Sequence, residues 1–429
     1  MHAAGVSSRA RFGVVGFCFA LAMITYVDRA CIGALSGEIR EDLGLSMTQM
    51  GYVFSAFAFA YALFEVPSAW WGEKIGARRV LTRIVLWWSG FTMLTAAATG
   101  FVSLWLARFL FGAGEAGAWP NATRVFSRWI PRQERGRVQG VFFAGAHLAA
   151  GITPLLVIAL TQVLSWRGVF VVFGFLGLGW AIVWAKWFRD SPRDHPGVNE
   201  AELALIEAGT DSSAQAGEAV RPGKIWGEVL RDANVWWLCL VAFANSYGFY
   251  FVITWLPTYL GTLGFTGAGA ALFAGLPMFF AVPADLLGGV TTDYLARRFG
   301  LRLGRALVGG LAYLVAAGAM FFATRVPENP VVAAVLLATA GGSSMFALAA
   351  SWASCIEISE VRSGLASATM NTAGQVGGIL SPLVLAWLVD RSGTAGQWTL
   401  PLQTIATLYF VAAIAWCFIK PPVRSQAAT

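Results

Sequence analysis

The segment "RDSPRDHPGVNEAELALIEAGTDSSAQAGEAVRPGK", residues 189–224, is the only long polar stretch in a chain of 429 residues. Hydrophobic residues make up 57% of the chain and charged residues only 12%, whereas roughly 25% of an ordinary soluble domain is charged. This composition predicts a polytopic membrane protein. The polar segment then becomes the connection between two membrane-embedded halves.

Apolar stretches long enough to cross a bilayer as helices, about 20 residues each, lie on both sides of this segment. We identify twelve, at residues 12–36, 51–71, 80–100, 102–128, 138–163, 168–188, 234–260, 268–292, 303–324, 331–357, 363–390 and 399–420. The sequence therefore predicts an all-α membrane protein with twelve transmembrane helices in two pseudo-symmetric six-helix bundles. The expected domains are 1–188 and 234–429, joined by a cytoplasmic linker, 189–233.

The linker itself divides into two parts. "NEAELALIEAG", residues 199–209, has the pattern of a short amphipathic helix at the membrane surface. The Ser-, Ala- and Gly-rich remainder is typical of a flexible connection. Neither part suggests a separate catalytic domain.

The basic residues predict the orientation of the spans. With both termini inside, most of the 30 Lys and Arg residues fall at cytoplasmic loops and helix ends, as the positive-inside rule requires. Only Arg40, Arg167, Arg325 and Arg391 fall outside. We therefore expect a multi-pass protein of the bacterial inner membrane with both termini cytoplasmic. The net charge of +7 reflects this topology rather than nucleic-acid binding.

The two halves repeat each other. "WGEKIGARR" (71–79) follows the second span and "GGVTTDYLARRFG" (288–300) follows the eighth, each an acid followed by basic residues. "PRQERGRVQG" (131–140) and "SEVRSGLASA" (359–368) follow the fourth and tenth spans. Internal repeats of this kind indicate a transporter whose site lies at the midplane between the halves.

These loop motifs resemble those of the major facilitator superfamily. Within it, four stretches resemble the anion:cation symporter family, which includes bacterial galactonate, hexuronate and glucarate permeases and sialin. They are "YVDRACIG", "GYVFSAFAFAYALFEVP", "RFLFGAGEAGAWP" and "ITWLPTYL", at residues 26–33, 51–67, 108–120 and 253–260. The resemblance implies the two-bundle fold and secondary active transport of an organic anion.

Four charged residues in the predicted spans are the central site candidates, because charges inside a membrane are costly and are usually functional. Asp28 and Arg29 lie on the first span, and Arg108 and Glu115 lie on the fourth. Counting from the outer ends of their spans, Arg29 and Arg108 share a depth. Arg108 and Glu115 are seven residues apart, so they project from one helical face.

The chemistry of these four residues suits coupled transport. An arginine binds a carboxylate through two parallel hydrogen bonds and keeps its charge at any working pH. A carboxylate in partly dry surroundings takes up a proton more readily than one in water. The resemblance implies proton coupling by Asp28 and Glu115 and anion binding by Arg29 and Arg108. Alternatively, the arginines only neutralise the acids and hold the helices together.

Other polar and aromatic residues are expected to line the substrate path. The resemblance implies this role for Tyr26 and Tyr61, and His147 has small neighbours that leave room beside it. Glu65 and Asp285 are weaker candidates for a part in coupling. The C-terminal half supplies neutral hydrogen-bonding groups and two aromatic residues, namely Asn245, Tyr247, Ser351, Trp352, Asn371 and Gln375.

Positive charge in one half and neutral polar groups in the other favour a ligand with one carboxylate and a polar tail. We therefore expect a proton-coupled symporter that imports a sugar acid, a hexonate or hexuronate, by alternating access. The alternatives are an aldarate, an aromatic or dicarboxylic acid, a drug/proton antiporter or a membrane enzyme.

The expected partners are the organic anion and the lipid bilayer, with no nucleic acid, and the chain is expected to act as a monomer. No cofactor other than the coupling proton is expected. The five scattered cysteines predict neither a disulfide framework nor a metal site.

Overall fold

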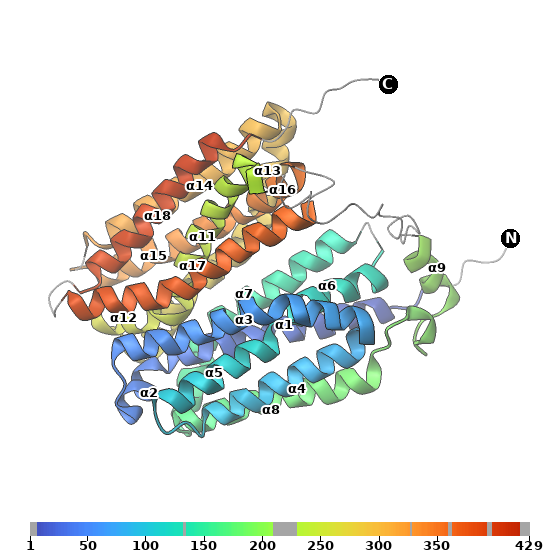
Figure 1. The fold of residues 1–429 in the computed structure, drawn as a ribbon, viewed down its shortest axis with the longest axis horizontal. Coiled ribbons are helices and arrows are strands. Elements are labelled where there is room, and N and C mark those ends of the chain that lie inside the picture. Colours follow the sequence, from blue (N-terminus) through green and yellow to red (C-terminus); the bar gives the residue numbers. More distant parts are fainter. Residues whose placement is uncertain are drawn as a thin grey trace. The chain divides into compact units, whose positions relative to one another are not determined.

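The computed structural model describes residues 7–131, 134–208, 230–326, 328–358, 363–392 and 397–420, and every regular element within these ranges is a helix (Figure 1). The chain forms two compact units. The first runs to Gly44 and then from Ala56 into the linker, and the second comprises Leu45–Ser55 and the chain after the linker. The domain limits expected from the sequence, 1–188 and 234–429, stay a prediction.

The helices of the first part of the chain are α1 (Ala10–Ala34), α2 (Ser36–Leu43), α3 (Met47–Ile75), α4 (Ala77–Thr95), α5 (Phe101–Glu115), α6 (Ala118–Trp129), α7 (Arg135–Thr161), α8 (Trp166–Trp187), the 3₁₀ turn η1 (Pro192–Asp194) and α9 (Glu200–Ala208). The later helices are α11 (Ala233–Thr254), α12 (Leu256–Thr262), α13 (Gly267–Phe299), α14 (Leu301–Ala323), α15 (Pro330–Phe346), α16 (Leu348–Ile358), α17 (Ser363–Arg391) and α18 (Thr399–Phe418).

The local sequence explains where two of these helices, α11 and α15, begin. The Asp232 side chain accepts a hydrogen bond from the backbone N–H of Asn234 (2.9 Å) at the start of α11. Asn329 accepts one from the N–H of Val332 (3.2 Å) at the start of α15, where Pro330 occupies the first turn. Such side chains satisfy N–H groups that have no partner inside the helix, and proline is tolerated there because its missing N–H is not needed.

All twelve predicted spans are helical, which confirms the fold class. Ten helical stretches in the described part of the chain are long and apolar enough to cross a membrane. The other two predicted spans differ for physical reasons: α4 carries Arg78, Arg79 and Arg83, and the span predicted at 102–128 is two helices, α5 and α6. The break at Ala116–Gly117 directly follows Glu115. The predicted spans 234–260 and 331–357 are likewise divided, at Trp255 and at Ala347.

The internal repeat is visible in the packing within each unit. In the first, the first span packs against the fifth (α1 on α7) and the third against the sixth (α4 on α8). In the second, the corresponding helices pair in the same way, α11 on α17 and α14 on α18. The repeats predicted from the loop motifs therefore correspond to repeated helix pairing, although residues 132–133 and 359–362 of two of these motifs lie outside the described residues.

The predicted linker helix is α9, and its Glu202 holds the start of α1. The buried Glu202 carboxylate accepts hydrogen bonds from the backbone N–H groups of Ala10 and Arg11 (both 3.1 Å) and from the Ser8 hydroxyl (2.5 Å). It also forms an ion pair with the Arg11 guanidinium (3.2 Å). A carboxylate at a helix N-terminus interacts favourably with the helix dipole. The rest of the predicted flexible linker, 209–229, lies outside the described residues.

Replacing Glu202 by Gln is expected to lower the free energy of unfolding by about 1.5–3 kcal/mol, the range for hydrogen bonds to a charged group. The amide keeps the size of the side chain but loses the charge that Arg11 and the helix start require. Thermal unfolding of the purified protein in detergent measures the change, with the exposed Glu200→Gln as the matched control. An unfolding temperature equal to that of the control would show that α9 does not stabilise α1.

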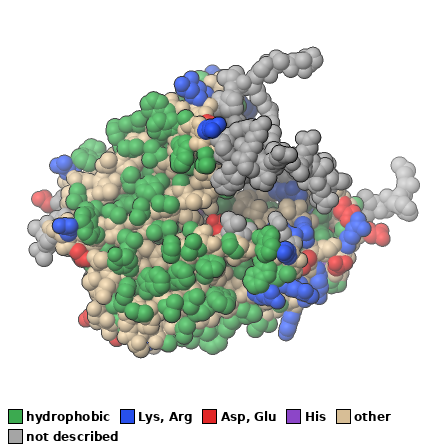
Figure 2. Space-filling model, in the orientation of Figure 1, with side chains coloured by type: hydrophobic (Ala, Val, Ile, Leu, Met, Phe, Trp, Pro, Cys, Tyr) green, Lys and Arg blue, Asp and Glu red, His purple; other side chains and the backbone are tan. Residues whose placement is uncertain are grey.

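Large apolar side chains cover the outside of the molecule, as a lipid environment requires. In Figure 2 hydrophobic side chains spread over the visible face. Val102, Val163 and Phe175 are among the most exposed, and they belong to segments at or inside the predicted spans. Exposed apolar patches of this extent mark a membrane-facing surface.

Candidate substrate and proton site

The four charged residues predicted from the sequence all lie in the first unit, on α1 and α5. Asp28 is 1% exposed, Arg108 is 2% exposed and Glu115 is completely buried, and the Arg29 side chain is 10% exposed. Asp28 and Arg29 are consecutive in α1, so their side chains leave the helix in directions about 100° apart. The two adjacent, oppositely charged side chains therefore point in different directions and contact different neighbours.

Arg29 forms an ion pair with Glu115 across the two helices. Its Nε donates to Glu115 Oε1 (2.5 Å), and an Nη of the same guanidinium contacts the same oxygen. Three aromatic rings surround the guanidinium, with centroids at 5.2 Å (Tyr26), 4.9 Å (Phe57) and 5.0 Å (Tyr61). Aromatic faces attract a cation, so this group holds Arg29 in one orientation.

A close approach of α3 and α5 makes this arrangement possible. A Cβ added to Gly112 of α5 would lie 2.5 Å from the carbonyl oxygen of Phe57 in α3, closer than real Cβ contacts allow. Glycine lets two helix backbones come together in a membrane bundle. Because Phe57 is also one of the rings against Arg29, this contact places the aromatic group and Glu115 around the same guanidinium.

Arg108 completes the charged cluster. Its guanidinium lies 3.9 Å from the ring centroid of Phe111 and 6.0 Å from that of Phe57. It interacts electrostatically with Asp28, Glu115 and Arg29, and Asp28 interacts in turn with Glu115. Two guanidinium groups and two carboxylates in one buried cluster give no net charge when all are ionised. We call these residues, Asp28, Arg29, Arg108 and Glu115, the charged cluster.

Asp28 faces α4, a contact that the sequence reasoning missed. Thr92 and Trp88 lie close enough to interact with the Asp28 carboxylate. No contact of that carboxylate with a described residue meets ordinary hydrogen-bond geometry. The hydroxyls of Thr92 and Ser89 and the Trp88 indole N–H are buried without a hydrogen-bond partner among the described residues. Since buried polar groups are usually satisfied, the Thr92 hydroxyl and the Trp88 indole N–H are potential hydrogen-bond donors to the acid.

Replacing Thr92 by Val is expected to move the pH dependence of uptake to higher pH. Removing a hydroxyl donor beside Asp28 favours the protonated carboxylic acid over the carboxylate, and valine keeps nearly the same shape. The measurement is initial uptake across a pH series. Thr95→Val is the matched control, because the Thr95 hydroxyl already donates to the Phe91 carbonyl (2.8 Å). Identical profiles for the two variants would exclude a role for Thr92 at Asp28.

Tyr26 and His147 belong to an aromatic group beside the charged cluster. The Tyr26 ring meets the rings of Trp119 (6.0 Å between centroids) and His147 (6.2 Å), both edge to face. Trp119 is the second residue of α6, just after the helix break, and also stacks on Phe143. The structure thus brings together Tyr26, Tyr61 and His147 with the four charged residues in the first unit.

The weaker acidic candidates lie in separate places. Glu65, on α3, interacts electrostatically with Arg29, so it lies near the charged cluster. Asp285 lies in the middle of α13 in the second unit. Asp285 therefore belongs to a different unit from the four charged residues, which all belong to the first.

The residues predicted in the C-terminal half are distributed over several helices of the second unit. Asn245 of α11 is buried and donates to the Ser344 carbonyl of α15 (3.2 Å), so it joins two helices. Tyr247 is also buried. The Ser351 hydroxyl donates a hydrogen bond to the carbonyl of Ala347, four residues earlier in the chain (3.2 Å). Trp352, by contrast, is 39% exposed.

Asn371 and Gln375 are partly exposed and lie one turn apart on α17, as the spacing predicted. The Gln375 Oε1 accepts no hydrogen bond from any described residue. The Gln375 amide oxygen can therefore accept a new hydrogen bond.

Sequence reasoning missed Phe57, Trp88, Thr92 and Trp119. Trp88 and Thr92 are spaced four apart on α4, which was a signal for a shared helical face. Trp119 and Phe57 carried no signal, because the chain contains 19 Trp and 31 Phe residues. Among the described residues no group of three or more His, Cys, Asp or Glu side chains is placed to bind a metal ion.

Two repeated halves of six helical spans, with paired charges buried in the first, define a polytopic membrane transporter. The chain matches the Major Facilitator Superfamily over residues 18–382, and it belongs to this family. The family resemblance predicted from the loop and helix motifs is thereby confirmed. The chain is a transporter and not an enzyme.

Curated relatives are organic-anion transporters. A protein of Cupriavidus necator named "Probable sulfoacetate transporter SauU" is 35% identical over 96% of this chain and 94% of its own length. The "D-galactonate transporter" of Escherichia coli is 32% identical over 97% of both chains. The "Probable galactarate/D-glucarate transporter GudP" of Bacillus subtilis is 30% identical over 91% of this chain and 88% of its own.

Solved structures share the fold. A bacterial homologue of the human lysosomal transporter Spinster, in an inward-facing and unoccupied conformation, superposes with a TM-score of 0.77 at 19% identity, covering 97% of this chain and 99% of that one. A D-xylose-proton symporter gives 0.76 at 15% identity, covering 96% and 98%. At these identities the likeness establishes the fold alone.

Proposed function

We propose that this transporter is a proton-coupled symporter that imports a small organic anion by alternating access. The buried ion pair between Arg29 and Glu115 is the observation that carries the proposal. It unites a cation able to bind a substrate carboxylate with an acid able to bind a proton. The names of the relatives support an anionic substrate.

The ion pair gives a physical reason for coupling. A substrate carboxylate that binds Arg29 competes with Glu115 for the same guanidinium. A displaced, buried Glu115 carboxylate without a partner is unfavourable by several kcal/mol, and a proton removes that penalty. A bound carboxylate and one bound proton together leave the total charge of the cluster unchanged. Substrate and proton therefore favour each other's binding.

Asp28 is the second proposed proton carrier. It interacts electrostatically with Arg108, without the ion pair that joins Glu115 to Arg29, and it lies beside Thr92 and Trp88 of α4. Arg108 is then the second proposed anion contact. The roles of these four residues, and of Tyr26, Tyr61 and His147 as substrate contacts, remain proposals.

A sugar acid, a hexonate or hexuronate, is the proposed substrate. The neutral side chains Asn371 and Gln375 suit the hydroxyl groups of such a molecule, and relatives are named for galactonate and for galactarate and glucarate. A second candidate is a short sulfonate such as sulfoacetate, favoured by the name of the 35% identical relative. A sulfonate, like a carboxylate, offers several oxygens to an arginine.

The orientation of the chain in the membrane is also proposed. The predominance of Lys and Arg in the loops on one face of the spans supports the inner membrane, with both termini in the cytoplasm. A monomeric transporter with the proton as its only coupling ion is likewise proposed.

Uptake by proteoliposomes tests the proposal directly. The purified chain is reconstituted, an inward proton gradient is imposed, and labelled galactonate, glucuronate, glucarate, sulfoacetate and benzoate are compared. Accumulation of a hexonate or hexuronate above equilibrium, abolished by collapsing the gradient, is the expected result. Accumulation of sulfoacetate alone would replace the sugar acid by the second candidate. Acid-driven accumulation of none of these anions would contradict the proposal.

A further inference from the structure

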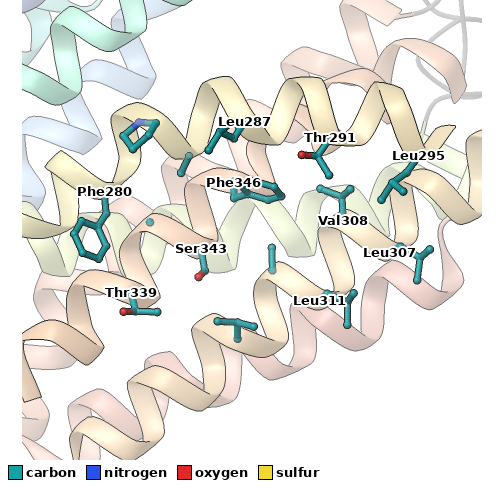
Figure 3. A pocket seen from close by; sticks show the side chains of 15 residues that line it. Phe280, Leu287, Thr291, Leu295, Leu307, Val308, Leu311, Thr339, Ser343 and Phe346 are labelled. Atoms are coloured by element: carbon teal, nitrogen blue, oxygen red, sulfur yellow. The ribbon is translucent and has the colours of Figure 1, made fainter. Parts of the chain in front are cut away.

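A groove on the second unit, separate from the charged cluster, lies between α13, α14 and α15. Its volume is about 660 Å³, within the range of ligand sites in proteins. Phe280, Leu287 and Leu295 of α13, Leu307 and Leu311 of α14 and Phe346 of α15 are among the side chains that line it (Figure 3). Leu287 and Leu311 are each 58% exposed, so the groove opens to the outside of the unit.

The groove has two different ends. In Figure 3, Phe280 and Thr339 mark one end, and Leu295 and Leu307 mark the other. The second end lies at the junction of α13 and α14, which are connected by the single residue Gly300 in a left-handed conformation (φ 85°). The polar lining is slight: the Thr339 hydroxyl, for example, already donates to the Val335 carbonyl (2.9 Å). An acyl chain rather than a polar molecule suits this lining.

Basic side chains are concentrated at the junction end. Arg298 lies three residues after Leu295, so it continues the same helical stripe that lines the groove. Arg297 and Arg302 flank the junction, and all three arginines are exposed. None of the three forms an ion pair with an acid in the described part of the chain.

The acid at this junction is already neutralised. Asp293 accepts a hydrogen bond from Arg305 (2.9 Å), whose buried guanidinium also donates to the Thr292 hydroxyl (3.2 Å). The pair of Asp293 and Arg305 therefore contributes no net charge. The excess at this end of the groove is the positive charge of three exposed arginines.

We infer that this groove binds an anionic phospholipid, with an acyl chain between α13, α14 and α15 and the phosphate at Arg298 and its neighbours. Basic pockets between transmembrane helices attract anionic headgroups, and a Lys or Arg near an anionic lipid contributes about 1 kcal/mol. Arginine also binds phosphate through two parallel hydrogen bonds. The net positive charge favours an anionic headgroup over a zwitterionic one. This inference does not depend on the transported substrate or on proton coupling.

Native mass spectrometry of the full chain tests this site. The protein is released from nanodiscs that contain equal amounts of phosphatidylglycerol and phosphatidylethanolamine, and the lipids that stay bound are counted. We expect preferential retention of phosphatidylglycerol. Arg298→Gln is expected to lower that retention about fivefold, the effect of one basic residue. Leu311→Trp, which fills the groove, is expected to lower it at least as much.

Matched variants make the result specific. Arg325→Gln removes an exposed arginine at the far end of α14, and Leu314→Trp enlarges a lipid-exposed leucine on α14 that does not line the groove. Both should retain phosphatidylglycerol like the unaltered protein. Equal retention of the two lipids, or a loss that is the same for groove and control variants, would overturn the inference. So would a dimer that replaces bound lipid in the spectrum, because the groove would then bind a second copy.

Discussion

Glu115→Gln is expected to abolish proton-driven accumulation while leaving exchange of substrate across the membrane measurable. Glutamine has the shape of a protonated glutamic acid and cannot release a proton, so the carrier stays in the state that favours substrate binding. The variant can then carry substrate across the membrane in either direction. The proton gradient, however, no longer drives accumulation of the substrate. Uptake under an inward proton gradient and counterflow into substrate-loaded proteoliposomes measure the two activities separately.

The matched control for this variant is Glu38→Gln, which changes an exposed acid on α2 in the same unit. It should accumulate substrate like the unaltered protein. If Glu115→Gln also accumulates substrate at an undiminished level, Glu115 is not a coupling carboxylate, and the proton would have to bind elsewhere in the chain.

Arg29→Gln is expected to eliminate substrate binding and to destabilise the protein strongly. Removing one partner of a buried ion pair leaves the other charge without compensation, at a cost of about 3–5 kcal/mol. The double variant Arg29→Gln with Glu115→Gln removes both charges. It should recover most of the lost stability, because the two effects are coupled through one contact. It should still fail to transport.

Thermal unfolding and substrate-dependent thermal shift of the two single variants and the double variant measure this coupling. A bound ligand raises the apparent stability of the folded state, so loss of the shift reports loss of binding. Arg167→Gln is the control, since the exposed Arg167 at the start of α8 pairs with the exposed Asp42 and holds the pKa of that carboxyl below its usual value through a hydrogen bond. Its unfolding temperature should change little. Additive effects of the two buried substitutions would contradict the pairing.

The presence and location of the charged cluster could be predicted from the sequence. Asp28, Arg29, Arg108 and Glu115 are charges in apolar spans, and counting residues from the helix ends places Arg29 and Arg108 at one depth. The choice of partners could not be predicted in the same way. Which guanidinium meets which carboxylate depends on how α1 and α5 rotate against each other. It also depends on the Phe57 ring of α3, which the close approach of Gly112 to Phe57 brings to Arg29 only in three dimensions.

The part of the site on α4 was missed for a related reason. A buried Thr or Trp is ordinary in a membrane helix, and only the proximity to Asp28 gives Thr92 and Trp88 a role. The break between α5 and α6 was also missed, because the composition of residues 102–128 is that of one span. The fold itself was more predictable, since apolar length, loop charge and internal repetition all indicate the same arrangement.

The most direct measurement of coupling records proton movement and substrate movement in one experiment. Proteoliposomes that contain the chain and a pH-sensitive dye are placed in buffer without a proton gradient, and a hexonate or hexuronate identified by the uptake comparison is added outside. We expect the lumen to become more acidic as substrate enters, and Glu115→Gln to abolish this acidification while exchange continues. Entry of the anion with no change of internal pH would contradict proton-coupled symport.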